Sequence, residues 1–589
     1  MELPGLIYTN ENCISCNKCV KVCTSPGASY LHIKGNNLAV YINPSRCVSC
    51  GACFSICEHD ARGYRDDTEA FFEDLARGEA VSVLVAPAFK AAYPEEYGRI
   101  LGGLKALGVR RIISVAFGAD ICTWAYLKYM EENDYYGAIS TPCPVTVSYV
   151  EHCVPELIPR LMPVQSPMNC AAVYCREELG ITDRLAFIGP CIGKKLETDD
   201  YGGGPVHYNV TFLKLMAYVH EHHVYGEDVS DEIEYGLGSF YPAPGGLADN
   251  IRWFLGDDAR IRVVSGKTYL YGWINKNAAR LASGEVPFML IDALNCQDGC
   301  IEGTASEAGR FEGDESLYTI QTIREISKRP DEDSPWNPAL TPPQRLERLN
   351  RMFAGLSLTH YMRSYTDRSG NFRIQIPTQE EADRIFNEMH KPTPESRQIN
   401  CSTCGYASCY DMMVAIYNHF NDKRSCIYYE KEEALRLERL SFYDQMTGAL
   451  NRRAMESSLV NMMFPHKSVA VIVVDINGLK EANDTLGHEA GDRLIITVAG
   501  CLISSFGSGN VFRTGGDEFL VIWQDHSEEE VKKEIEQVRM KLAKDGSSAA
   551  IGYAYISEFA SNFEEMKSQA DKAMYEDKEQ YYARTGKRR

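Results

Sequence analysis

Residues 511–523, VFRTGGDEFLVIW, place two apolar runs on either side of a Gly-Gly pair. Apolar runs around such a turn predict a β-hairpin, with Asp517 and Glu518 at its tip. Upstream, VAVIVVDI at residues 469–476 predicts a buried strand ending at Asp475, followed by a polar loop and a helix. Carboxylates at a strand end and a hairpin tip can hold Mg²⁺ against nucleotide phosphates. The pattern therefore predicts a metal-dependent phosphate site.

The flanking motifs DQMTGALNRR and ADKAMYEDK occur in order around this hairpin. With them, residues 443 to about 585 resemble GGDEF diguanylate cyclases. The resemblance implies a palm-type cyclase fold with three metal ligands, which are Asp475, the Ile476 carbonyl and Asp517, with Glu518 assisting and Asp517 also a candidate base. It implies four further contacts to GTP: Asn483 and Asp492 at guanine, and Lys480 and Lys578 at the phosphates. Two GTP molecules must face each other, so activity implies a homodimer.

Two runs with identical cysteine spacing lie near the start of the chain, CISCNKCVKVC and CVSCGACFSIC. Their C-x2-C-x2-C-x3-C spacing suits two [4Fe-4S] cubanes, in which the fourth cysteine of each run binds the other cluster. The predicted ligand sets are Cys13, Cys16, Cys19 with Cys57, and Cys47, Cys50, Cys53 with Cys23. Zinc is the alternative, although zinc ribbons use two separated C-x2-C pairs. Residues 1–65 resemble bacterial two-cluster ferredoxins.

The composition limits the setting of these motifs. A chain of 589 residues is long enough for about three to five domains. The net charge of −20 argues against a nucleic-acid partner, which would need clustered Lys and Arg. No apolar run is long enough to span a membrane, and the start lacks an export signal, so we expect a cytoplasmic protein. There, 21 cysteines indicate metal or redox chemistry more than disulfides.

From about residue 80 apolar strands alternate with amphipathic helices, which predicts an α/β architecture. Three cysteine signals follow predicted strands: STPCP, GPCIGKKLE and LNCQDGC, at residues 140–144, 189–197 and 294–300. In this order they resemble the three signatures of the iron-only ([FeFe]) hydrogenase catalytic domain. The resemblance extends over residues 80 to about 310, within a predicted domain of residues 80–330.

The resemblance implies an H-cluster, in which a [4Fe-4S] cubane is joined to a two-iron unit. The implied ligands are Cys143, Cys191, Cys296 and Cys300. Lys194 matches the lysine that holds a cyanide of the two-iron unit, a suitable role for a fixed cation. Two alternatives stay open: Cys143 as a buried core thiol, and a scaffold that holds only the cubane.

The chain departs from this family where protons are moved. Pro142 stands where the family has a proton-relaying cysteine, and the proton-path carboxylates align with Ala125, Tyr126 and Tyr129. None of these side chains ionises near neutral pH. We therefore expect hydrogenase activity to be slow or absent. A site with its ligands but without its proton path suits a sensor.

Residues 331–395 are predicted to be a linker and helical segment because residues 330–350 are polar and proline-rich. A C-x2-C-x4-C-x16-C run then resembles the small [4Fe-4S] domain of sensory hydrogenases, predicted at residues 396–428, with zinc as the alternative. Its implied ligands are Cys401, Cys404, Cys409 and Cys426. Residues 429–442 lack Gly and Pro and should form a signalling helix, or else a solvated linker, before the cyclase domain of residues 443–589.

The expected fold class is thus multidomain α/β and α+β, with ferredoxin-like, two-lobed hydrogenase-like, small helical [4Fe-4S] and GGDEF palm domains. The expected function is hydrogen or redox sensing that regulates synthesis of cyclic di-GMP from two GTP. Expected cofactors are three [4Fe-4S] clusters, an H-cluster and Mg²⁺; expected partners are a second copy, a ferredoxin-like electron carrier and hydrogenase maturation enzymes. The alternatives are a catalytic hydrogenase with a regulatory GTP-binding domain, and a four-cubane interaction protein.

Overall fold

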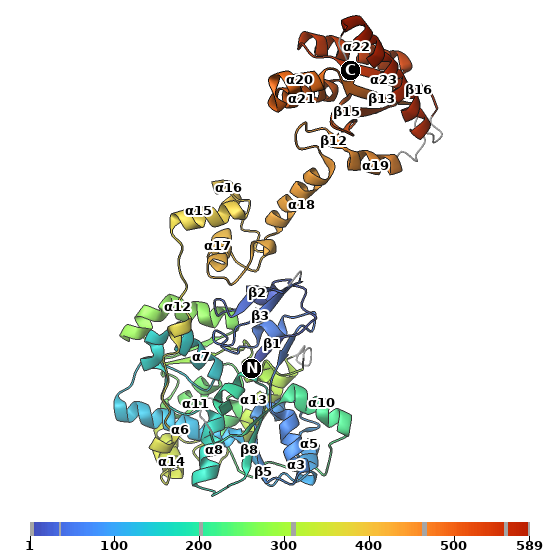
Figure 1. The fold of residues 1–589 in the computed structure, drawn as a ribbon. Helices are drawn as coiled ribbons and strands as arrows, with labels where there is room; N and C mark the ends of the chain where they lie inside the picture. Colours follow the sequence, from blue (N-terminus) through green and yellow to red (C-terminus); the bar gives the residue numbers. More distant parts are fainter. Residues whose placement is uncertain are drawn as a thin grey trace. The chain divides into compact units, whose positions relative to one another are not determined.

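The computed structural model describes residues 5–34, 37–199, 204–307, 314–461, 468–558 and 563–586 (Figure 1). The chain forms two compact units, Met1–Ile427 and Tyr428–Arg589. In the described ranges no helix has both the length and the apolar character needed to cross a membrane.

The start of the first unit has a ferredoxin-like arrangement of two small antiparallel sheets. These pair β1 (Ile7–Thr9) with β4 (Arg62–Tyr64), and β2 (Ser29–Lys34) with β3 (Asn37–Ile42). Each cysteine run contains one short helix, α1 (Lys18–Lys21) or α2 (Ala52–Ser55). Because the first and last strands pair, the two cysteine runs are held within one small core.

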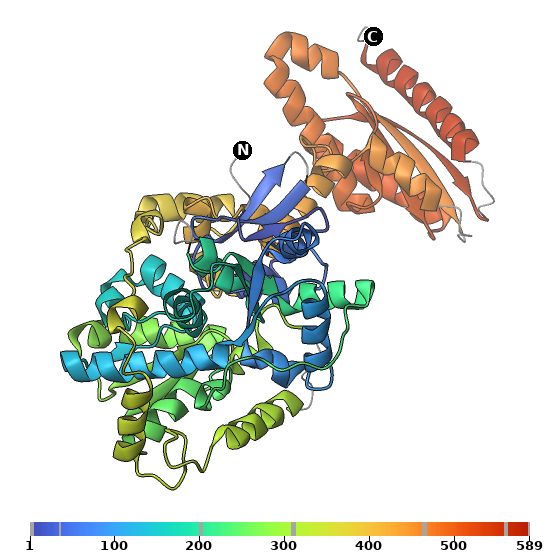
Figure 2. The same ribbon diagram turned by 90° about the horizontal axis from the view of Figure 1, so that it is seen from below.

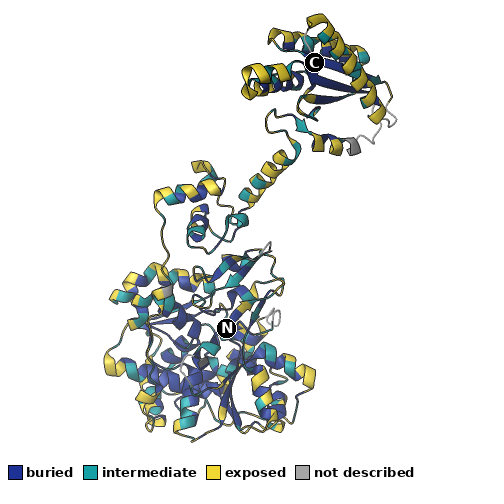
Figure 3. Ribbon diagram, viewed as in Figure 1, coloured by how far each residue is buried: buried dark blue, intermediate teal, exposed yellow. Residues whose placement is uncertain are grey.

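The first lobe of the hydrogenase-like domain is a parallel sheet in the order β6-β5-β8-β9. Its strands are β5 (Val81–Val85), β6 (Ile112–Ser114), β8 (Arg184–Gly189) and β9 (Tyr208–Thr211). Every residue of β5 is buried, as expected for a strand covered by helices on both faces (Figure 3). Its helices are α3 (Thr68–Ala76), α4 (Pro87–Ala92), α5 (Tyr97–Ala106), α8 (Pro167–Glu177), α9 (Lys195–Asp199) and α10 (Phe212–His222).

The second lobe is a smaller parallel sheet in the order β10-β11-β7. Its strands are β7 (Ala138–Ile139), β10 (Ile261–Ser265) and β11 (Leu290–Leu294). Its helices are α6 (Val115–Asn133), α7 (Pro144–Cys153), α11 (Gly246–Leu255), α12 (Lys267–Ser283) and α13 (Glu315–Ser327). The hydrogenase-like cysteines follow the carboxyl ends of β7, β8 and β11, where ligands bind in α/β proteins.

The proline-rich segment after the second lobe is partly built into that lobe. Trp336 is 3% exposed, and α14 (Pro342–Met352) packs against α11 and contributes the buried Leu349. Three helices follow: α15 (Gln379–Glu388), α16 (Pro394–Arg397) and α17 (Cys409–Tyr417). The end of the first unit is therefore helical, and part of the segment expected to be a linker belongs to the second lobe.

The second unit is a five-stranded sheet in the order β12-β14-β15-β13-β16. Its strands are β12 (Leu450–Asn451), β13 (Val469–Ile476), β14 (Val511–Arg513), β15 (Glu518–Gln524) and β16 (Ala549–Ile556). Helices α21 (His488–Phe506) and α22 (Glu528–Lys544) pack in one apolar core, whereas α19 (Arg452–Asn461) and the long α23 (Phe563–Thr585) pack in another (Figure 2). Helix α20 (Leu479–Leu486) precedes α21.

Helix α18 (Ile427–Phe442) begins directly after Cys426 and leads in sequence into the second unit. None of its residues is buried (Figure 3). Residues Ile427–Phe442 therefore form a solvent-exposed helix, and a signalling role for it stays a prediction.

Candidate functional site

The candidate cyclase site lies at one end of the sheet in the second unit. Asp475 is opposite Glu518 in the antiparallel register of β13 and β15, and the Ile476 amide donates to the Asp517 carbonyl at 3.1 Å. Strands β14 and β15 pair from Val511↔Val521 to Arg513↔Phe519, so the hairpin tip holds Asp517. Asp475 is buried and Glu518 is exposed. Carboxylate and carbonyl oxygens thus meet at one edge, and they are the ligands that Mg²⁺ prefers.

The candidate phosphate and guanine contacts surround this edge. The Lys578 ammonium bonds to the Asp475 carboxylate, and Lys480 is exposed in the first turn of α20. A Cβ at Gly491 would lie 2.0 Å from Asn483 Oδ1, so glycine at the start of α21 leaves room for the Asn483 amide. Asp492 follows on the exposed side of α21. The candidate GTP contacts therefore come from three helices.

Arg513 was not singled out by the sequence, but it connects the hairpin tip to the start of the domain. Its Nη2 donates to the Gly516 carbonyl at 2.8 Å and its Nη1 to Asp444 Oδ1 at 3.0 Å. Asp444 also accepts from Thr447, at 2.7 Å from the hydroxyl. Asp444 belongs to the motif DQMTGALNRR and lies two residues after the end of α18. This motif therefore anchors the hairpin that carries Asp517.

We expect Arg513→Ala to lower the cyclase kcat by about 10- to 100-fold while changing the KM for GTP less than about threefold, because the carboxylates stay but their hairpin loses both anchors. Steady-state rates over a range of GTP concentrations measure the two effects separately. Lys532→Ala, which removes a half-exposed cation paired with Glu528 on α22, is the control and should behave like the parent. A rise in KM without a loss of kcat would contradict the positioning role.

In the first unit, the hydrogenase-like cysteines gather at the carboxyl ends of the two sheets. Burial, followed by the Cys143 thiol, raises the pKa of Cys191 to about 11, and burial with Cys191 and Cys143 raises that of Cys296 to about 12. The pKa of Cys300 is raised well above its usual value by burial and then by the other three thiols. The four cysteines thus lie close together, with Cys143 buried and the other three half-buried.

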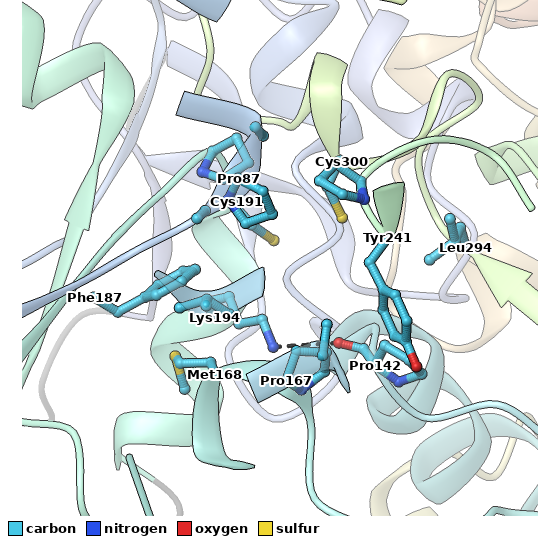
Figure 4. Close-up of a pocket in the computed structure, with 16 residues that line it drawn as sticks. Pro87, Pro142, Pro167, Met168, Phe187, Cys191, Lys194, Tyr241, Leu294 and Cys300 are labelled. Atoms are coloured by element: carbon cyan, nitrogen blue, oxygen red, sulfur yellow. Dashed lines mark hydrogen bonds between the residues drawn. The ribbon is translucent and has the colours of Figure 1, made fainter. Parts of the chain in front are cut away.

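A cavity of about 80 Å³ lies beside Cys191 and Cys300 (Figure 4). Its walls are almost entirely apolar, formed in part by Met168, Phe187 and Leu294. Tyr241 also lines the cavity, and its charged member is the Lys194 ammonium, which donates to the Pro142 carbonyl at 3.2 Å and to Glu197 at 2.5 Å. An apolar cavity with one fixed cation and cysteines at its edge fits a compact metal group with small anionic ligands.

The substituted proton-path positions do not supply ionisable groups to this cavity. Pro142 lines it with a ring that has no proton to give. Tyr126 is buried, and its hydroxyl accepts from the Thr141 amide at 2.8 Å. Burial, more than any neighbouring charge, raises the pKa of Tyr126 well above its usual range. Ala125 is buried in the same core, and Tyr129 is a partly buried neighbour of it.

The ferredoxin-like cysteines occupy two places in their small core. Burial first, with Cys23 among the contributing thiols, raises the pKa values of Cys47, Cys50 and Cys53. Burial, together with Cys13 and Cys16, likewise raises the pKa of Cys19. The Cys19 sulfur accepts a hydrogen bond from the Arg62 guanidinium at 2.9 Å.

In the small domain after the linker, Cys404 lies near Cys401 and Cys426, and Cys409 is buried at the start of α17. Within the described ranges, no three His, Cys, Asp or Glu side chains are arranged to bind a single metal ion. A cubane places each thiolate on a different iron atom, so its ligands need not form such an arrangement. The assignment of each cysteine to a cluster stays a prediction.

Three family models match separate parts of this chain. They are the 4Fe-4S dicluster domain at residues 12–61, the C-terminal domain of the iron only hydrogenase large subunit, at residues 79–304, and the diguanylate cyclase GGDEF domain at residues 441–584. The chain therefore joins three segments that each match one of these family models. The resemblances predicted for these three segments and the predicted fold class are confirmed, and the matches support iron–sulfur cofactors. The resemblance of residues 396–428 to a small [4Fe-4S] domain stays a prediction.

The curated relatives match only part of the chain. The probable diguanylate cyclase DgcI of Escherichia coli (strain K12) is 33% identical over 143 residues, which are 23% of this chain and 31% of the relative. Diguanylate cyclase DgcN of the same strain is 34% identical over 157 residues, 24% of this chain and 38% of the relative. The chain thus spans about a third of the length of these relatives.

Two solved structures are similar to separate parts of this chain. One is an apo [FeFe]-hydrogenase HydA1 from Chlamydomonas reinhardtii, which is 16% identical. The match covers 52% of this chain and 100% of the hydrogenase chain, with a TM-score of 0.37. The other is the coiled coil and GGDEF domain of DgcB from Caulobacter crescentus, which is 21% identical. The match covers 27% of this chain and 88% of the DgcB chain, with a TM-score of 0.23.

Proposed function

We propose that this protein is a signalling enzyme in which the hydrogenase-like domain senses hydrogen or redox state and regulates the synthesis of cyclic di-GMP from two GTP. One observation carries the proposal: the chain joins a carboxylate edge, Asp475 with Asp517 and Glu518, to a four-cysteine set whose proton-path positions hold no group that ionises near neutral pH. The first site can perform chemistry. The hydrogenase-like site keeps the cysteines that can bind a metal group but lacks the side chains needed for rapid proton delivery.

The cyclase reaction needs the hairpin carboxylates, two lysines and a second protomer. Mg²⁺ held by Asp475, the Ile476 carbonyl and Asp517, with Glu518 assisting, would neutralise triphosphate charge. Asp517 would accept the proton of the 3′-hydroxyl as it attacks the α-phosphate of the GTP on the other protomer, and pyrophosphate would leave. Lys480 and Lys578 would offset the charge that develops on the phosphates, while Asn483 and Asp492 bind guanine.

The sensing site would use the hydrogenase-like cysteines together with Lys194. Cys143, Cys191, Cys296 and Cys300 fit the ligand set of an H-cluster, a group that supplies redox change and gas binding when present. Lys194 would hold an anionic ligand, and the apolar walls would exclude water. A bias of about 1.4 kcal/mol between two cyclase arrangements is enough for a tenfold change in output.

The test compares cyclic di-GMP formation under hydrogen and under argon, using anaerobic protein made with the maturation enzymes. We expect a reproducible difference of at least about threefold that is lost in Cys300→Ala and kept in Cys175→Ala, a buried core thiol of the first lobe. Equal rates under the two gases would reject hydrogen sensing. Equal rates at reducing and oxidising potentials as well would reject redox sensing.

A further inference from the structure

The small cysteine domain, defined here as residues 396–427, contacts the ferredoxin-like domain through its backbone. The Leu31 amide of β2 donates to the Phe420 carbonyl at 2.9 Å, across 389 positions of sequence. Tyr406 packs against the core of the ferredoxin-like domain. The two cysteine-bearing domains therefore meet in one packed interface within the first unit.

Arg46 holds this interface together through carbonyl and ring contacts. It is only 9% exposed, and its Nη1 donates to the Pro26 carbonyl at 3.0 Å. Its guanidinium lies 4.7 Å from the ring centre of Phe420 and 5.5 Å from that of Phe372. A buried guanidinium between two rings is a specific contact, because its charge is satisfied only while the rings and carbonyls stay in place.

Two glycines, one from each domain, allow the close approach. A Cβ at Gly27, where φ is +74°, would lie 2.7 Å from the Phe420 ring. A Cβ at Gly405, where φ is +91°, would lie 2.9 Å from the Val20 Cβ and 3.0 Å from the Asn17 carbonyl. Gly405 therefore serves two needs, the left-handed backbone conformation directly after Cys404 and the close contact with α1.

Tyr406 is the side chain that lies near both cysteine sets. It directly follows Gly405, whose contact with Val20 of α1 lies between Cys19 and Cys23, and its side chain packs against the ferredoxin-like core. Burial, before any neighbouring charge, raises the pKa of its hydroxyl above its usual range. Cys404 belongs to the small domain, whereas Cys23 lies with Cys47, Cys50 and Cys53. Because both sets of thiols lie close to the Tyr406 ring, a change of charge at one set alters the electrostatic potential at the other.

We propose that the small cysteine domain is docked on the ferredoxin-like domain as a fixed module, with Tyr406 as the positioning residue that couples the Cys23 set to the Cys404 set. The coupling part rests on the proposed function, since it requires both sets to hold iron–sulfur clusters. Cys426 immediately precedes α18, so the Cys404 set is the one nearest in sequence to the helix that leads to the cyclase.

Docking is tested on the full chain by hydrogen exchange. We expect Gly27→Ala to speed exchange of the Leu31 amide at least about tenfold, because the new methyl group displaces Phe420. Gly78→Ala is the control, since Gly78 has a similar φ of +82° but nothing within 4 Å of the added Cβ. Unchanged exchange in Gly27→Ala, or equal changes in both variants, would overturn the docking.

Coupling is tested on the cluster-loaded chain by a redox titration followed by electron paramagnetic resonance. At a fixed potential, we expect Tyr406→Ala to change the reduced fraction of the small-domain cluster at least about threefold, whereas Tyr410→Ala, at a neighbouring residue that is 50% exposed, leaves it unchanged. Equal fractions in parent and Tyr406→Ala would overturn the coupling. Absence of clusters by iron analysis would instead reject the cofactor assignment of the proposed function, and the exchange result would still decide docking.

Discussion

Replacing Asp475 with asparagine should lower the rate of cyclic di-GMP formation about 10³-fold, because it removes charge from the most buried member of the carboxylate edge. Asp475 is 6% exposed, lies opposite Glu518 and bonds to the Lys578 ammonium. Asparagine keeps the shape of the side chain but is a poor ligand for Mg²⁺. It also leaves Lys578 without the negative charge that holds it beside the phosphate site.

The measurement is chromatographic quantification of cyclic di-GMP made from GTP, with circular dichroism to show that the fold is retained. Asp571→Asn, an exposed carboxylate on α23, serves as the matched control and should keep the parent rate. If Asp475→Asn keeps more than about a tenth of the parent rate, the metal site lies elsewhere.

The geometry of this edge follows directly from local sequence pattern. The alternation of VFRTGGDEFLVIW sets the hairpin, and the apolar run of β13 places Asp475 beside it. A strand has a period of two residues, so a buried face fixes the register and with it the meeting of Asp475 and Glu518. The cysteine runs are equally local, because their spacing alone brings three thiolates together.

The contacts that could not be predicted from the sequence join residues that lie far apart in the chain and share no motif. Arg513 and Asp444 are 69 positions apart, and only the folded sheet shows that they form an ion pair. The segment around Trp336 is rich in proline and charge, which suggests a linker, yet its tryptophan is buried against the second lobe. Composition averages over a segment, whereas a single buried aromatic side chain decides where the segment packs.

Glu197 is a further residue that sequence reasoning passed over, although it is the only carboxylate recorded in contact with Lys194 among the described residues. It is 2% exposed, and its Oε2 accepts from the Lys194 ammonium at 2.5 Å and from the Ser166 hydroxyl at 3.0 Å. Its Oε1 accepts from the Arg363 guanidinium at 3.0 Å. The Arg363 partner comes from the segment expected to be a linker, which thereby contributes to the support of the sensing cavity.

Glu197→Gln should destabilise the first unit by about 3–5 kcal/mol, because it leaves two buried cations without their shared negative charge. Urea unfolding followed by tryptophan fluorescence reports mainly on this unit, since only Trp523 of the five tryptophans lies in the second unit. Glu73→Gln, which breaks a pair whose side chains are 64% and 65% exposed, should leave the midpoint unchanged.

A second substitution separates charge from packing at the same site. If removal of the shared negative charge causes the loss, adding Lys194→Met to Glu197→Gln should recover at least about 1 kcal/mol, because one of the two buried positive charges is then gone. If the loss comes only from packing, the second change should add its own cost instead. Recovery would show that Glu197 holds the ammonium at the cavity by charge, which is the condition for Lys194 to orient an anionic ligand there.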